Sequence, residues 1–253
     1  MKAGTIALSY APIKRAKEMT GCRISHENRN APKEDDRMAL LFVQNWDITQ
    51  GREDEYSQFV SDTYIPETTS MGFISVGGYY VEAGFGPRIV AVQTAEDLNT
   101  LSGIVTKKQF RDLIRKLKSI VCNYRIYVLE PAGRTRIEKY IIQKGVWKFN
   151  QYYDIRTDRK EEYSDFVLQE YIPAIKKIDY VKTIRGWNVY FGGVSEIIAE
   201  FTFKGPVDIG RLLDNEDFRG VTQKLKSDYV HNYSSRILRC TERFDEHKWS
   251  RLL

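Results

Sequence analysis

Hydrophobic positions fall into two kinds of run along the chain: short runs of strand length, and longer runs in which they recur every three or four residues. The short runs are apolar or aromatic and are bounded by glycine, proline or polar clusters, which predicts β-strands. In chain order the predicted strands cover residues 39–46, 75–82, 88–93, 121–129, 146–153, 183–191, 196–203 and 229–238.

The longer runs predict amphipathic helices between these strands. Apolar residues over 56–64 lie on one helical face, and Pro66 is expected to end this helix or to follow it directly. Thr106 followed by Gln109 is a capping-box pattern that predicts the start of a further helix. Asn215, a residue type that favours the N-cap position, is expected to open the corresponding helix later in the chain.

The pattern repeats. Residues 44–66 and 151–173 align without a gap, and 12 of the 23 positions are identical, where composition alone would give roughly one or two. Further blocks match in the same order with small slips, among them Asn123-Tyr124 with Asn232-Tyr233. The sequence therefore indicates two copies of one module of roughly a hundred residues, each with the order strand, helix, strand, strand, helix, strand.

This βαββαβ order is that of a ferredoxin-like module, a four-stranded antiparallel sheet with both helices on one face. The bare face of each sheet must be covered, and two copies in one chain can cover each other. We predict an α+β fold in which two tandem ferredoxin-like modules pack their sheets as an intrachain barrel. The predicted parts are an N-terminal arm (1–37), a first module (38–130), a linker (131–144), a second module (145–241) and a C-terminal tail (242–253).

The element order, the duplication and a short broken turn at 95–101 resemble the dimeric α+β barrel superfamily over roughly residues 38–241. The chain is most similar there to NIPSNAP-like and antibiotic-monooxygenase-like proteins. The resemblance implies a small molecule bound between the helices and the sheet or inside the barrel. Some members are cofactor-free oxygenases or isomerases, and chlorite-dismutase-like members bind haem. No haem motif is matched here residue by residue, so we expect no cofactor.

The net charge of +5 suggests nucleic-acid binding until the charges are located. Residues 1–37 carry +3 and residues 131–148 carry +4, which leaves −2 for the rest of the chain. A nucleic-acid reader concentrates its basic charge on the folded face that docks. We therefore expect no nucleic-acid partner.

Three cysteines without metal-ligand spacing, Cys22, Cys122 and Cys240, favour reduced thiols in the cytoplasm. No window approaches the ~20 apolar residues that span a bilayer, and the first residues have no secretory cleavage pattern. We expect a cytoplasmic protein with no membrane contact. The arm and the tail, which carries Phe244 and Trp249, are expected to hold a homo-oligomer together.

His231 is the single histidine within the two modules, and its counterpart in the first copy is Cys122. Both residue types can act as base, nucleophile or metal ligand, although a lone histidine is more often a hydrogen-bonded structural residue. Asp154 ends a strand directly before a helix. It is a candidate general base at a pocket mouth, against the commoner role of forming the turn.

Arg185 and Trp187 lie two positions apart on one predicted strand and therefore on one face of it. An arginine beside a tryptophan would bind a planar anion by charge and stacking, and the same pair could equally cover a barrel end. Tyr171, just before Pro173, could direct its hydroxyl into a cavity, although packing with the phenol at the surface is the commoner arrangement.

We therefore predict a small-molecule-binding barrel protein with its site in the second copy: His231 and Asp154 as catalytic residues, and Arg185, Trp187 and Tyr171 as ligand-binding residues. The chemistry would be that of a cofactor-independent oxygenase or isomerase acting on an aromatic or hydrophobic substrate. One alternative is a non-catalytic structural subunit of an oligomeric assembly. The other is a haem- or metal-dependent enzyme that uses His231. No metal site is expected, because His26 and His247 lie in the extensions.

Overall fold

A computed structural model describes residues 40–132, 145–193 and 195–241. Residues 40–132 are called the first half below, and residues 145–241 the second half. The first half contains β1 (Leu40–Ile48), α1 (Glu53–Phe59), η2 (Val60–Tyr64), α2 (Ile65–Ser70), β2 (Ile74–Gly84), β3 (Ile89–Ala95), α3 (Leu98–Val105), α4 (Lys108–Ile120) and β4 (Val121–Pro131). The second half contains β5 (Trp147–Ile155), η3 (Thr157–Arg159), α5 (Lys160–Phe166), η4 (Val167–Tyr171), α6 (Ile172–Lys176), β6 (Thr183–Gly192), β7 (Ile197–Phe203), α7 (Pro206–Asp214), α8 (Glu216–Lys224), η5 (Leu225–Tyr229) and β8 (Val230–Cys240).

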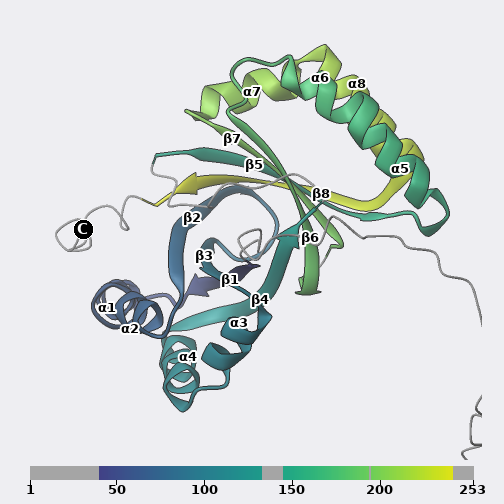
Figure 1. The fold of residues 1–253 in the computed structure, drawn as a ribbon. Helices are drawn as coiled ribbons and strands as arrows, with labels where there is room; N and C mark the ends of the chain where they lie inside the picture. The colour runs from purple at the N-terminus through teal and green to yellow at the C-terminus, as the bar shows by residue number, and fades with distance from the viewer. Residues whose placement is uncertain (1–39, 133–144, 194, 242–253) are drawn as a thin grey trace, which may run out of the picture. The chain divides into compact units, whose positions relative to one another are not determined.

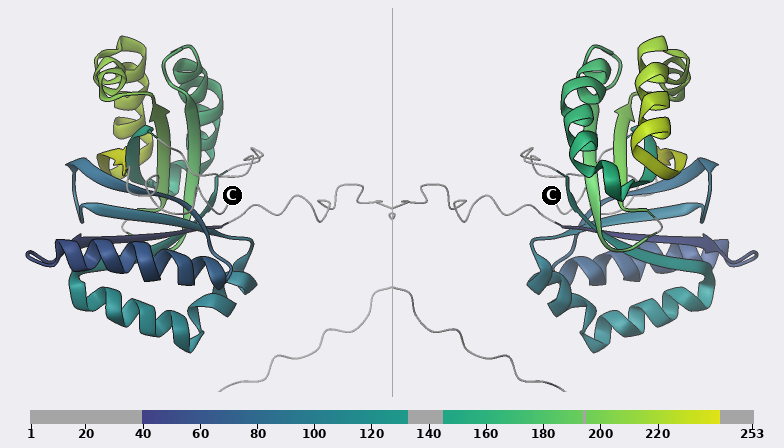
Figure 2. Two further views of the ribbon diagram at one scale, coloured as in Figure 1. Left: turned by 90° about the vertical axis from the view of Figure 1, so that its left-hand side faces the viewer. Right: turned by 90° about the vertical axis from the view of Figure 1, so that its right-hand side faces the viewer.

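The eight strands form one closed antiparallel barrel in the order β1-β3-β2-β8-β5-β7-β6-β4 (Figure 1). Within each half the four strands make one sheet, and the halves are joined at two seams where β2 pairs with β8 and β4 pairs with β6. Helices α1–α4 lie along the outer face of the first sheet and α5–α8 along that of the second (Figures 1 and 2). The predicted fold class is confirmed. Closure leaves none of the described strands with an edge open for pairing with another chain.

The helix that follows β1 continues past Pro66, contrary to the prediction, and ends at Ser70. The reason is a five-residue π-helical turn, η2, directly before α2. A proline in a regular α-helix collides with the carbonyl four residues back and leaves it without a donor. A widened turn relieves both problems, and Pro66 falls in the first turn of α2, where its missing N–H costs least.

The segment predicted as a broken turn contains the helix α3, whose N-cap is Asp97. Its carboxylate accepts from the Thr100 N–H at 2.7 Å. The predicted capping role of Thr106 is wrong, because its hydroxyl donates back to the Ser102 carbonyl at 2.7 Å and so belongs to the end of α3. The prediction for Asn215 is confirmed, since its side chain caps α8 by accepting from the Phe218 N–H at 3.0 Å.

Three apolar clusters hold the described chain together. Two lie between the helices and the sheet of each half, and the third fills the barrel. The barrel cluster includes Tyr79 and Trp187, each 1% exposed. An ion pair is buried with it: Lys148 Nζ lies 3.0 Å from Glu200 Oε2 and 4.3 Å from the centre of the Tyr79 ring. The predicted arm, linker and tail lie largely outside the described residues, so their boundaries stay a prediction.

Candidate functional site

His231 and Asp154 are register neighbours on β8 and β5. His231 is exposed, so the described chain does not enclose a ligand around it. The Asp154 carboxylate accepts from the Glu196 N–H at 2.7 Å and from the Asn232 side-chain amide at 2.9 Å. Asp47 accepts the matching pair of bonds in the first half, which favours the turn-forming role for both aspartates.

Arg185 and Trp187 lie on β6. Arg185 is near the Glu200 carboxylate, and Trp187 lines a cavity that Glu200 also lines. Arg185 Nη1 is 3.9 Å from Glu200 Oε1, and the Arg185 side chain is 18% exposed. Trp187 lines the same small interior cavity as Glu200, with a volume of about 30 Å³. This space holds roughly two waters and no ligand larger than that.

Tyr171 lies in a third place, under the helices of the second half. It is 3% exposed, and its hydroxyl donates to Gln151 Oε1 at 2.6 Å. The five predicted site residues therefore fall into three separate groups and do not line one pocket.

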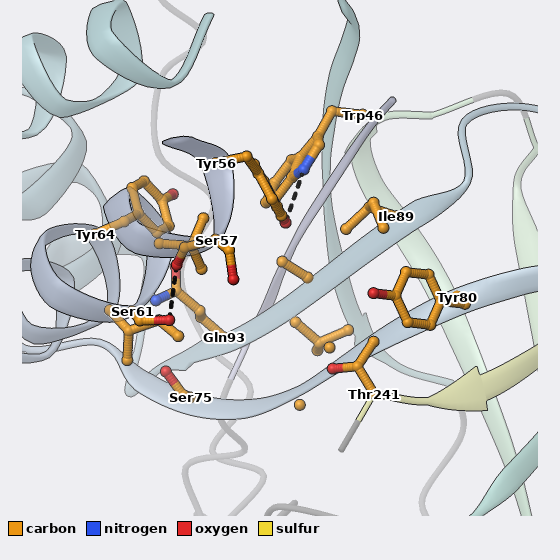
Figure 3. A pocket seen from close by; sticks show the side chains of 16 residues that line it. Trp46, Tyr56, Ser57, Ser61, Tyr64, Ser75, Tyr80, Ile89, Gln93 and Thr241 are labelled. Carbon is orange, nitrogen blue, oxygen red and sulfur yellow. Dashed lines mark hydrogen bonds between the residues drawn. The ribbon is translucent and has the colours of Figure 1, made fainter. Parts of the chain in front are cut away.

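A pocket in the first half lies between α1, η2 and the outer face of β1, β3 and β2 (Figure 3). We call it the helix–sheet pocket. The enclosed cavity measures about 40 Å³, and the whole hollow, counted together with its opening to solvent, about 660 Å³. Its walls are mostly apolar or aromatic: Trp46, Tyr56, Val60, Tyr64, Ile65, Tyr80, Ile89, Ala91 and Val92.

A buried hydrogen-bond network stands behind one wall of this pocket. Gln44 Oε1 accepts from the hydroxyls of Tyr64 and Tyr124, both at 2.8 Å. Gln44 donates in turn to Gln93 at 3.3 Å, and Gln93 donates to the Thr68 hydroxyl at 2.9 Å. Such a satisfied network fixes the rotamers of its members, so this wall is rigid.

The tyrosines of this network stay protonated. Burial raises the pKa of Tyr64 well above its usual value, and the neighbouring Tyr124 raises it further. Burial also raises the pKa of Tyr124. Both phenols therefore act at neutral pH as hydrogen-bond donors and not as bases.

Two hydroxyls at the pocket wall lack a partner among the described residues. Ser75 Oγ and Thr241 Oγ1 are buried, and neither makes a hydrogen bond there. Figure 3 shows Ser75 on β2 and Thr241 just beyond the end of β8, where its N–H donates to the Gly78 carbonyl at 2.8 Å. A buried hydroxyl without a partner costs about 1–3 kcal/mol, which a polar atom of a ligand in the pocket would offset.

The described part of the second half lacks this pair of open hydroxyls. Thr183, which aligns with Ser75, shares a hydrogen bond of 2.6 Å with Thr202. Ala132 is the equivalent of Thr241, because its N–H donates to the Gly186 carbonyl as the Thr241 N–H donates to that of Gly78, and alanine has no hydroxyl. Phe201 aligns with Gln93 and packs against Phe149 and Phe218. The open pair formed by Ser75 and Thr241 is therefore specific to the first half, although the second half keeps the tyrosine–glutamine hydrogen bond as Tyr171 to Gln151.

The reactive residue types His, Arg and Trp favour the second copy as the site. Serine, threonine and glutamine carry no such signal, so the sequence does not point to the helix–sheet pocket. A usable signal was present in the alignment of the copies, where Gln93 stands against Phe201. A polar residue on a strand position that is aromatic in the other copy marks a place where the packing differs.

Among residues 40–132, 145–193 and 195–241, no group of three or more His, Cys, Asp or Glu side chains could hold a metal ion. No helix in those ranges is long and apolar enough to cross a membrane.

Comparison with known proteins supports the fold. No protein-family model matches the sequence, and no curated protein is similar to it. A candidate monooxygenase from Fusobacterium nucleatum is similar in structure, with a TM-score of 0.56 and 11% identity over 80% of this chain and 92% of its own. A candidate chlorite dismutase gives a TM-score of 0.54 at 11% identity, over 82% and 96% of the two chains. A haem-binding protein from Thermus thermophilus gives 0.52 at 9% identity, over 81% and 92%. At these identities the likeness shows a shared α+β barrel fold.

Proposed function

We propose that this protein binds a small, largely apolar aromatic molecule in the helix–sheet pocket of the first half. The observation that carries the proposal is the pair of buried hydroxyls, Ser75 Oγ and Thr241 Oγ1, at the wall of an otherwise apolar pocket. Apolar walls with a few convergent polar groups are the usual composition of a small-molecule site. The ligand would carry one hydroxyl or carbonyl group to meet these two side chains.

The pocket must widen to admit such a ligand. A cavity of about 40 Å³ holds roughly three waters, whereas a bicyclic ring needs more room. In this proposal Val60 and Ser61 are the side that moves apart, since both are only partly buried and lie on the π-helical turn η2. The opposite wall, held by the Gln44 network, stays fixed and supplies the orientation.

Binding is better supported than catalysis. No Asp, Glu, His, Lys, Arg or Cys is among the residues that line the pocket in the described chain. A cofactor-independent oxygenase or isomerase needs a base that removes a proton from its substrate. Tyr64 cannot serve, because its pKa is raised. An oxygenase or isomerase activity, and a specific relationship to NIPSNAP-like or antibiotic-monooxygenase-like proteins, are therefore proposals that go beyond ligand binding and rest on the shared fold alone.

A haem does not fit the residues of this pocket. Haem iron is held by His, Cys, Met or Tyr. No His, Cys or Met of the described chain lines the pocket, and of its tyrosines Tyr64 is engaged with Gln44 and Tyr56 with Trp46. Tyr80 also lines it, but a cavity of about 40 Å³ is far too small for the porphyrin ring. His231 is exposed at the rim of the barrel.

The assembly-subunit alternative depends on the arm and the tail, which lie outside the described residues.

The proposal is tested by titrating the full-length protein with 2-naphthol, a neutral bicyclic phenol, and following tryptophan fluorescence. Trp46 lines the pocket, so binding should change its emission. Ala91→Leu places three extra carbons on the pocket floor. Ala199→Leu is the matched control, because Ala91 faces Gln44 across the sheet as Ala199 faces Gln151.

We expect saturable binding that Ala91→Leu weakens at least tenfold and that Ala199→Leu changes less than twofold. Circular dichroism would confirm that both variants fold. Equal weakening in both variants, or none in Ala91→Leu, would place the probe elsewhere and contradict the proposal. Absence of saturable binding to the unmodified protein would contradict it as well.

A further inference from the structure

A second cavity lies at one mouth of the barrel, distinct from the helix–sheet pocket. We call it the barrel-mouth cavity. It measures about 310 Å³ and is bordered by residues of β1, β4, β5, β6, β7 and β8. Its walls combine two arginines with aromatic and aliphatic groups: Asn45, Arg125, Tyr127, Tyr152, Ile198 and Arg236. No Asp or Glu is among its described lining residues.

Arg236 is the unusual member of this set. It is only 5% exposed although its guanidinium is a cation with five N–H donors and no acceptor. Its neighbours stabilise it only in part: Nη1 donates to Asn45 Oδ1 at 3.2 Å, and the guanidinium lies 4.1 Å from the Phe85 ring centre and 5.1 Å from that of Tyr152. No carboxylate of the described chain forms an ion pair with it.

One edge of this guanidinium makes no hydrogen bond among the described residues. Nη1 is used by Asn45, whereas the buried Nε has no hydrogen-bond partner among the described residues. Nε and Nη2 form one edge of the planar group, and that edge matches the two oxygens of a carboxylate. The other buried cation in the part of the chain that the structure describes, Lys148, is already paired with Glu200. One buried positive charge therefore remains for an outside anion to neutralise.

We propose that the barrel-mouth cavity binds a small organic carboxylate. Its two oxygens would accept from Nε and Nη2 of Arg236, with Arg125 at the entrance adding a second positive charge. The apolar part of the ligand would lie against Tyr152 and Ile198. The guanidinium lies over the Phe85 ring and close to the Tyr152 ring, and these two aromatic contacts hold it in place for an incoming anion.

Isothermal titration calorimetry of the full-length protein at constant ionic strength tests this assignment with three probes: benzoate, its neutral isostere benzamide, and inorganic phosphate. We expect benzoate to bind at least tenfold more tightly than benzamide and more tightly than phosphate. Equal affinities for benzoate and benzamide would overturn the proposal. Preference for phosphate would overturn the choice of a carboxylate.

Variants locate the site. Arg236→Lys keeps the charge and removes the planar donor pair. We expect this variant to bind benzoate with an affinity at least tenfold lower. Arg239→Lys is the control, because Arg239 is on the same strand but pairs with Glu82 at the surface. Ala91→Leu should leave benzoate binding unchanged, which separates this cavity from the helix–sheet pocket. Unchanged affinity in Arg236→Lys would overturn the assignment, and the benzoate–benzamide comparison stands even if that variant does not fold.

Discussion

The two seams of the barrel should be sensitive to a single methyl group. Gly192 on β6 and its counterpart Gly84 on β2 lie where the two halves pair, opposite Tyr127 and Arg236. Gly192 has a φ of +76°, and a β-carbon there would lie 2.5 Å from the Ile126 carbonyl oxygen and 3.1 Å from the Tyr127 Cα. Gly84 meets the Ser235 carbonyl in the same way.

The cost of Gly192→Ala has two parts. A side chain in the left-handed region costs roughly 1–2 kcal/mol. Moving the Ile126 carbonyl from 2.5 Å to an ordinary contact of at least 3.4 Å requires a shift of about 0.9 Å in β4, comparable to overpacking at roughly 1–3 kcal/mol. We expect the free energy of unfolding to fall by about 3 kcal/mol, and the melting temperature by roughly 6–12 °C for a chain of this size.

Urea and thermal unfolding of Gly192→Ala and Gly84→Ala measure this effect. The control is Gly103→Ala, in the exposed interior of α3 with nothing within 4 Å of the added carbon, where alanine should stabilise by up to about 1 kcal/mol. If the seam variants are as stable as the Gly103 variant, the halves do not pair through β2–β8 and β4–β6 as described.

Two further predictions concern the interior. Lys148→Leu leaves the Glu200 carboxylate without its partner and should lower the free energy of unfolding by roughly 3–5 kcal/mol. Adding Glu200→Val, which copies the Leu41 and Val92 pair of the first half, should recover most of that loss in urea unfolding. Additive losses from the two substitutions would contradict this. Burial raises the pKa of Tyr233 to about 12, whereas an unfolded tyrosine ionises at about pH 10. Since the unfolded state loses its proton first as the pH rises, the midpoint of urea unfolding should fall steadily between about pH 10 and 12. A constant midpoint over that range would contradict this.

The fold was accessible from the sequence because its determinants are local and repeated. Strand and helix periodicities, the internal alignment and the need to cover two apolar sheet faces together lead to the barrel. The errors came from single residues whose local preference was overruled by their surroundings. Pro66 is a helix breaker by type, yet the π-helical turn accommodates it. Thr106 fits a cap pattern, yet its hydroxyl closes the preceding helix.

The candidate sites were less accessible because they depend on which side chains lack partners. Trp187 and Arg185 were correctly placed on one strand, but their environment, a packed barrel around Glu200, comes from strands far apart in sequence. Ser75 and Thr241 became notable only once the structure showed that no described group bonds to their hydroxyls. Arg236 likewise looks ordinary until the structure shows that it is buried and that no carboxylate of the described residues pairs with it.

A crystal structure of the protein grown with 2-naphthol would show whether the small-molecule site lies in the first half. We expect electron density for one probe molecule between η2 and β3, with its oxygen within hydrogen-bond distance of Ser75 Oγ or Thr241 Oγ1. Density in the second half or in the barrel mouth, with the helix–sheet pocket still closed, would mean that the helix–sheet pocket is not the site.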